Sequence, residues 1–81
     1  MKLFLISQQE KDGYDTYDSA VVCAPDESAA RNMSPDSGEP FNWNDPYSIW
    51  CSSPDKVEVT YLGEAVDGSI QGVVCASFNA G

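Results

Sequence analysis

The chain has 81 residues and a formal net charge of −9, because 13 carboxylates face only four basic side chains and no histidine. A chain this short makes one domain, residues 1–81, whose core is too thin for a deep substrate cavity. The acidity argues against direct nucleic-acid binding, which needs lysine and arginine, and against binding to anionic membranes.

Two strands are expected at the start of the chain. Lys2–Ser7 is apolar and β-prone, and Tyr17–Ala24 is a second run of this kind. Between them, Asp12-Gly13 marks a turn. Ala20–Ala24 lacks polar alternation, which indicates burial on both faces or a central position in a sheet. We expect the two strands to pair as an antiparallel hairpin with a loop longer than the minimal type.

One helix is expected at Pro25–Met33. Proline suits the first helical position, and the acids Asp26 and Glu27 complement the positive end of the helix dipole. Ser34-Pro35 then ends the helix, because the residue before a proline avoids helical backbone angles.

Two further strands are expected in the second half of the chain. Lys56–Leu62 alternates, with Val57, Val59 and Tyr61 on one face, so its other face should meet water. Gly72–Phe78 is the last strand. The order ββαββ predicts an α+β fold, in which a four-stranded, mainly antiparallel sheet has one helix on one face and a long aromatic-rich loop.

Residues 34–55 are rich in Pro, Ser, Asp and Asn, yet four large aromatic residues lie among them. These are Phe41, Trp43, Tyr47 and Trp50. In one interpretation Phe41, Trp43 and Tyr47 are exposed anchors of a partner interface. The favoured interpretation is that the aromatic residues form a satellite core beneath the loop, with Trp50 the most buried. A short helical turn is expected at Pro46–Trp50.

No catalytic residue is predicted. Without histidine, the chain has no base for a Ser–His or Cys–His pair. Its six glycines are scattered at turns and form no phosphate-binding loop. We therefore do not expect an enzyme, and no cofactor is implied.

No metal site is predicted either. The three cysteines lack CxxC spacing and are Cys23, Cys51 and Cys75. We expect them to be small buried hydrophobic residues, since a zinc site would need a carboxylate as well. Asp12, Asp15 and Asp18 stand three residues apart, but they fail the calcium-loop pattern of the EF-hand.

Six carboxylates lie between the first loop and the start of the expected helix. They are Glu10, Asp12, Asp15, Asp18, Asp26 and Glu27. If the hairpin tip and the helix start meet, these acids form one negative face that suits a basic partner surface. The average density is roughly one net charge per 500 Å², against roughly one per 100 Å² on duplex DNA. Mimicry of DNA therefore requires that the acids cluster on one side.

The apolar runs of the chain are short. The longest, Leu3–Ile6 and Ala20–Ala24, fall far below the roughly 18 residues of a membrane span. Polar residues 7–10 stand where a signal peptide would need small residues for cleavage. We expect the protein to stay in the cytoplasm of the cell that makes it.

Several stretches of the chain together carry a resemblance: Met1–Gln8, Gly13–Val22, Asp26-Glu27, Ala30-Arg31, Trp50, Leu62–Ala65 and Ala76–Gly81. In these stretches the chain resembles a family of small bacteriophage and prophage proteins. The resemblance covers most of the chain except residues 34–49, and it brings no enzymatic motif. In size, charge and lack of catalytic residues, the chain is similar to anti-CRISPR proteins. Many of these occupy the basic DNA-binding grooves of CRISPR effector complexes.

We therefore expect a phage-encoded acidic protein that inhibits a nucleic-acid-handling complex in the cytoplasm of a bacterial host. A CRISPR effector complex, bound at its basic DNA-binding surface, is the leading partner. The alternative is a phage structural or accessory protein that binds another phage protein or self-associates, through the aromatic loop or an open sheet edge. The expected state is a monomer or a homodimer.

Overall fold

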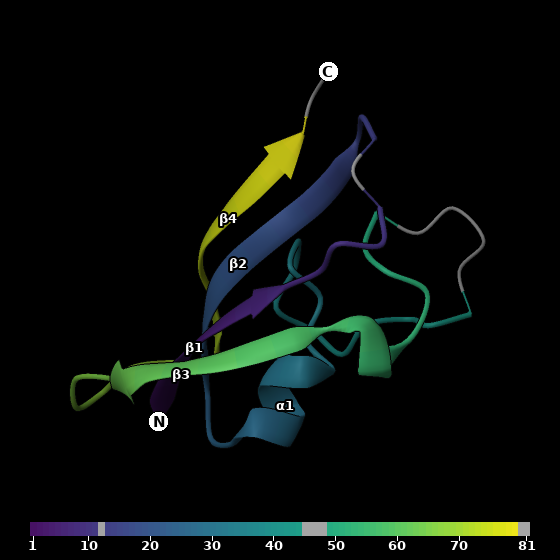
Figure 1. Cartoon of the computed structure of the whole chain (residues 1–81). Coiled ribbons are helices and arrows are strands. Elements are labelled where there is room, and N and C mark those ends of the chain that lie inside the picture. Colours follow the sequence, from purple (N-terminus) through teal and green to yellow (C-terminus); the bar gives the residue numbers. More distant parts are fainter. Residues whose placement is uncertain (12, 45–48, 80–81) are drawn as a thin grey trace.

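The computed structural model describes residues 1–11, 13–44 and 49–79 and shows an α+β fold (Figure 1). The strands are β1 (Lys2–Ser7), β2 (Thr16–Ala24), β3 (Glu58–Glu64) and β4 (Gly72–Asn79). They form one antiparallel sheet in the order β3-β1-β2-β4, with the short helix α1 (Glu27–Arg31) against it. The predicted fold class is confirmed.

The central hairpin joins β1 to β2 in an unbroken register, from Lys2 opposite Ala24 to Ser7 opposite Ser19. The expected central position of the second strand is thereby confirmed. The buried side chain of Gln8 fastens the long hairpin loop. Its Nε2 donates to the backbone oxygen of Tyr17 at 2.9 Å, and its Oε1 accepts from the backbone N–H of Lys11 at 2.8 Å.

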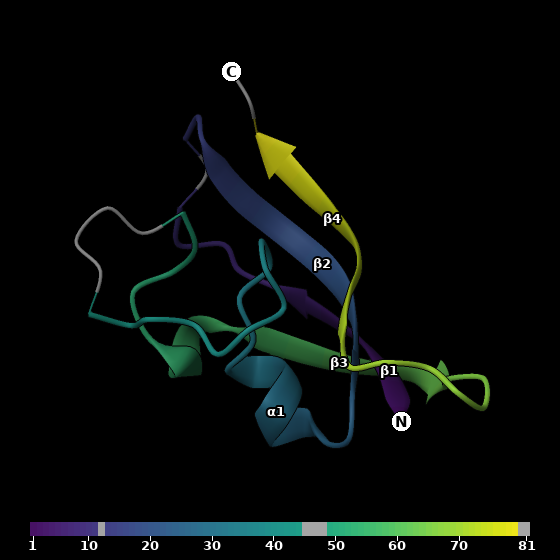
Figure 2. The ribbon, with the colours of Figure 1, turned by 180° about the vertical axis from the view of Figure 1, so that it is seen from behind.

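The two outer strands are consecutive along the chain but lie at opposite edges of the sheet. Residues 65–71 therefore cross from one edge to the other, past the N-terminus of the chain (Figures 1 and 2). The backbone N–H of Ala65 donates to the carbonyl of Met1 at 3.1 Å, which holds the start of this connection against the end of β1.

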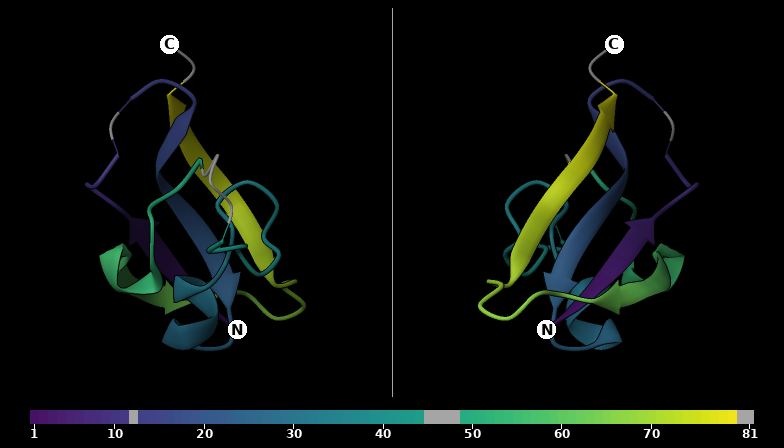
Figure 3. Two further views of the ribbon diagram at one scale, coloured as in Figure 1. Left: turned by 90° about the vertical axis from the view of Figure 1, so that its right-hand side faces the viewer. Right: turned by 90° about the vertical axis from the view of Figure 1, so that its left-hand side faces the viewer.

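One face of the sheet is covered by α1 and by the segment that follows it (Figure 3). The buried apolar cluster joins both layers and consists of Phe4, Ile6, Ala20, Val22, Ala24, Ala30, Met33, Trp50, Cys51 and Val57. Segment 33–57 thus contributes large side chains to the core although its composition is typical of a loop.

The opposite face of the sheet is open. Strand alternation places there the apolar residues Leu3, Leu5, Val21, Cys23 and Cys75. Within the described part of the chain no helix lies over this face, but the connection of residues 65–71 crosses the end at which Cys23 is buried (Figure 3, right). Leu3, Leu5 and Val21 are half-buried by their neighbours in the sheet, whereas Cys75 on the outer strand is exposed.

The helix is shorter than the sequence predicts. Asp26 has extended backbone angles, and its carboxylate accepts from the N–H of Ala29 at 2.8 Å. Asp26 is therefore the N-cap, the helix begins at Glu27, and the preceding proline lies outside it. Asn32 ends the helix. The helical turn expected at Pro46–Trp50 falls mostly on residues outside the described ranges.

The third strand begins two residues later than predicted, because Pro54–Lys56 forms a turn of 3₁₀ helix before it. The predicted inward face of this strand is present, but burial decreases along it. Val57 is buried, Val59 is half-buried and Tyr61 is 55% exposed. A bulge opposite Leu3 and Phe4 interrupts the register near this end. Among the described residues, no helix is long and apolar enough to cross a membrane.

Candidate functional site

The predicted acids near the hairpin loop gather at the start of β2. Two of them are held by neighbouring segments. Glu10 accepts from the hydroxyl and the backbone N–H of Ser52, both at 2.8 Å, and Asp18 accepts from the side-chain amide of Asn79 at 2.9 Å. Asp15 lies exposed at the loop, with a positive φ of 60°. Asp12 lies outside the described residues.

The other two predicted acids, Asp26 and Glu27, lie beyond the opposite end of β2. That strand has nine residues, so about 26 Å of extended chain separates the two groups. The structure corrects the prediction of one acidic face, because the hairpin loop precedes the central strand and the helix follows it. Two separate acidic groups replace the single face.

The aromatic segment packs inward. Trp50 is fully buried, and Phe41 and Trp43 are half-buried against the core, with their ring centroids 4.6 Å apart. The satellite-core interpretation is confirmed for these three residues, which weakens the interface interpretation. Tyr47 lies outside the described residues.

Two of the three cysteines are buried as predicted, but Cys75 is exposed because β4 is an outer strand. Burial raises the pKa of the Cys51 thiol, so this sulfur is a poor nucleophile. Within the described ranges, no three His, Cys, Asp or Glu side chains are grouped to hold a metal ion.

An open groove of about 400 Å³ lies between the start of α1 and the outer half of the sheet. It is lined by Lys2, Phe4, Asp26, Glu27 and Tyr61. The pairing of β1 with β3 places the rings of Phe4 and Tyr61 edge to face, with centroids 5.9 Å apart. The groove therefore combines the exposed ring of Tyr61, which packs on the nearly buried Phe4, with two carboxylates at the helix start.

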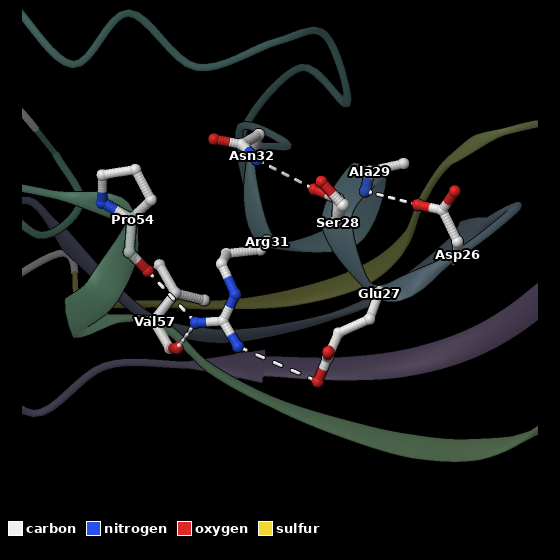
Figure 4. Close-up of polar contacts among 8 residues, drawn as sticks. All are labelled: Asp26, Glu27, Ser28, Ala29, Arg31, Asn32, Pro54 and Val57. Atoms are coloured by element: carbon white, nitrogen blue, oxygen red, sulfur yellow. Dashed lines mark hydrogen bonds and ion pairs between the residues drawn. The ribbon is translucent and has the colours of Figure 1, made fainter.

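The acidic side of the groove is only partly neutralised. Nη1 of Arg31 donates to the carbonyls of Pro54 and Val57, while its Nη2 lies 3.8 Å from the Glu27 carboxylate (Figure 4). Figure 4 shows the Glu27 side chain extending from the helix toward β1 and β3. A contact of 3.8 Å at an exposed position is weak, so this carboxylate is available to a second cation.

Further side chains determine the charge around the groove. The Tyr61 hydroxyl donates to Glu64, and this bond raises the pKa of Tyr61. Glu64 thus adds a carboxylate beside the aromatic side of the groove. One carboxylate oxygen of Asp26 accepts the hydrogen bond that caps the helix, and Lys2 contributes one positive charge to the groove. Three carboxylates, those of Asp26, Glu27 and Glu64, stand against the side chains of Lys2 and Arg31, so the side chains around the groove carry an excess of one negative charge.

The groove is suited to a guanidinium or ammonium group. Such a cation is attracted to the face of an aromatic ring and forms charge-assisted hydrogen bonds with carboxylates. Sequence reasoning selected Asp26 and Glu27 but missed Phe4 and Tyr61. The tyrosine reaches its position only through the pairing of two strands that lie far apart in the sequence, and no local motif encodes that pairing.

No protein-family model, curated protein or solved structure matches this chain at a significant level. The likeness to small phage proteins therefore stays a prediction, and the assignment of function rests on the groove and the charges around it.

Proposed function

We propose that the protein binds a basic protein surface, with the groove at the helix start receiving an arginine or lysine side chain of the partner. The observation that carries this proposal is the combination of Phe4 and Tyr61 with the carboxylates of Asp26 and Glu27 around one cavity. A net charge of −9 attracts basic surfaces from a distance, and the groove supplies a defined contact after encounter.

The partner class we propose is a nucleic-acid-handling complex. Such complexes present clustered lysine and arginine to phosphate groups, and this surface is complementary to an acidic protein. An inhibitor seated there excludes the nucleic acid from the site it needs. With the likeness to phage proteins, a bacterial CRISPR effector complex is the specific form of the proposal.

The division of the acids into two groups supports a particular mode of binding. Because the charges are not gathered on one face, the chain does not reproduce the phosphate spacing of a duplex. We propose instead that the groove anchors one basic side chain, while Asp15 and Asp18 at the far end of the central strand add attraction at longer range.

The groove is tested by two variants of equal net charge. Asp26→Asn with Glu27→Gln removes both groove charges and keeps a competent N-cap, since asparagine caps as well as aspartate. Glu39→Gln with Glu58→Gln removes two exposed charges elsewhere, since neither residue lines the groove. The probe is a fluorescent peptide of alternating arginine and glycine, followed by anisotropy.

We expect the groove variant to bind this peptide about three- to tenfold more weakly, and the control variant less than twofold more weakly. Raising salt from about 50 to 500 mM should weaken the wild type strongly, because the contacts are exposed. Equal losses in the two variants would show that only overall charge matters. Salt-independent binding would contradict electrostatic recognition altogether.

The proposed partner has its own test. A purified CRISPR effector complex is titrated with its labelled target duplex in the presence and absence of the protein. We expect the protein to lower duplex binding, and the groove variant to do so less than the control variant. Unchanged duplex binding would reject this partner, while the peptide titration reports separately on the groove.

A further inference from the structure

The two outer strands of the sheet differ in their chemistry. β3 begins and ends with glutamate, at Glu58 and Glu64, and contains a bulge. β4 has eight residues with no charged side chain and no proline, in a chain where 21% of residues are charged. Sheet edges expose unpaired N–H and C=O groups, and natural proteins commonly guard them with charges, prolines or bulges. Both outer strands lie beside register shifts, but β3 carries a glutamate at each end and β4 carries neither a charge nor a proline.

The unguarded part of β4 is its C-terminal half. Near its start, the register shift between the Val21–Cys75 and Val22–Val73 pairs marks a bulge. A loop also approaches there, since a Cβ atom on Gly38 would lie 3.1 Å from the Cα of Gly72. Beyond that point, no described segment lies beside the outer edge of the strand (Figures 1 and 3).

This half of the strand also exposes apolar surface. Phe78 is 43% exposed, although its ring lies 4.7 Å from that of Tyr17, and Val74 at the bulge is 61% exposed. Cys75 and Ala76 are exposed as well. A second register shift, between Tyr17 and Ser19 of β2, lies opposite Phe78 and Ser77. The uncharged and partly apolar outer edge still fits the addition of another strand, in which backbone hydrogen bonds supply most of the contacts.

We infer that this edge pairs with the same edge of a second copy of the chain. Antiparallel pairing of two β4 strands about a two-fold axis near Ala76 and Ser77 would join the two sheets into one of eight strands. Such an interface is closed, so it yields a dimer and leaves the two β3 strands as the outer edges.

The distribution of charge favours a second copy as the occupant. In a two-fold interface each side chain meets side chains of the same stretch of the other copy. Two copies of a chain with net charge −9 repel each other, so their interface has to be one that brings no carboxylates together. Self-pairing of β3 would bring Glu58 and Glu64 of the two copies together, whereas β4 brings no carboxylate. Of the acids near this strand, Asp18 is engaged by Asn79 and Asp36 by the hydroxyl of Tyr17. The exposed Asp15 lies beside Asn79, at the end of the strand.

The sheet provides a matched pair of variants. Ser77 and Thr60 are exposed hydroxyl residues on the same open face, but Ser77 is on β4 and Thr60 is on β3. Lysine at either position changes the net charge equally. Only Ser77→Lys places two positive charges close together across the proposed two-fold axis.

Sedimentation equilibrium at about 200 μM protein measures the outcome, a concentration chosen because an interface formed by one strand edge is small. We expect the wild type and Thr60→Lys to have about twice the 8.8 kDa chain mass, and Ser77→Lys to have the mass of one chain. Circular dichroism checks that both variants fold. Amide hydrogen exchange within residues 75–78 should slow with increasing concentration in the wild type and not in Ser77→Lys.

Three results would overturn the inference: a wild type that stays monomeric at this concentration, a Ser77→Lys variant that remains dimeric, or equal dissociation by the two lysine variants. A monomeric wild type would leave this edge to strands of other proteins. Ser77 lies outside the groove, so its lysine variant should still bind the arginine peptide. The peptide titration therefore fails or succeeds independently of the dimer.

Discussion

The two faces of the sheet show how a short chain allocates its apolar residues. On the covered face, Ile6, Val22 and Ala24 have no exposed surface, whereas on the open face Leu5 and Val21 are only half-buried. The difference comes from residues 33–44 and 49–57, which lie over one face and supply the fully buried Trp50. A segment with the composition of a loop therefore serves as a second layer, in the place of a longer helix.

The covering segment is fastened to the sheet at several points along its length. The backbone N–H of Tyr17 donates to the carbonyl of Ile49 at 2.8 Å, and its hydroxyl donates to Asp36 at 2.9 Å. Arg31 contributes the bonds to Pro54 and Val57 drawn in Figure 4. These polar contacts fix where the apolar side chains enter the core.

The strongest test of the covered face is Trp50→Ala. Truncating a buried tryptophan should lower the free energy of unfolding by about 3–5 kcal/mol, a large part of the stability of a small domain. Urea denaturation followed by circular dichroism measures this loss. Trp43→Ala is the matched control, because Trp43 belongs to the same segment but is half-buried. Similar losses in both variants would mean that the segment does not form a layer centred on Trp50.

Substitutions at two adjacent residues of β1 allow the contributions of the two faces to stability to be compared directly. Ile6→Thr places a hydroxyl in the core and should cost about 2–3 kcal/mol of unfolding free energy. Leu5→Thr changes the open face and should cost less than about 1 kcal/mol, since threonine is a good strand former and its hydroxyl reaches water. The measurement is again urea denaturation. A larger loss for Leu5→Thr would show that the open face is covered in solution.

The smallest expected loss of stability concerns the contact between Glu10 and Ser52, which joins the hairpin loop to the covering segment. The hydroxyl and then the N–H of Ser52, with lesser contributions from Lys56 and Lys11, lower the pKa of Glu10 in the folded chain. The contact is therefore fully present above the ordinary glutamate pKa of about 4.3 and is lost as the pH falls through the lower, folded value.

The lowered pKa of Glu10 makes the stability contributed by this contact depend on pH in a measurable way. The difference in urea midpoint between the wild type and Glu10→Gln should be largest at neutral pH and should vanish in acid. Glu39→Gln serves as the control, because Glu39 is exposed and bonds through its backbone. A difference for Glu10→Gln that grows in acid would contradict the lowered pKa.

The sequence was sufficient for the strands and the class of fold, because each strand carries a local pattern of apolar residues. Asp26 was recognised as part of the helix start, but its role as the cap required the backbone angles that the structure shows. The separation of the acids and the groove were not predictable. Both depend on which ends of the strands come together, and this depends on pairings such as Phe4 with Tyr61 that are distant in the sequence.

The placement of β3 and β4 at opposite edges has a consequence for how the chain folds. β1 and β2 are close in the sequence, but β1 also pairs with β3, from which it is separated by more than half of the chain. Such a topology has a high contact order, and we expect folding in milliseconds to seconds rather than microseconds. We expect the outer strands to dock onto a β1–β2 hairpin already formed, because that hairpin joins strands that are close in the sequence. Until they do, both sides of that hairpin are open, so refolding at high protein concentration should compete with aggregation.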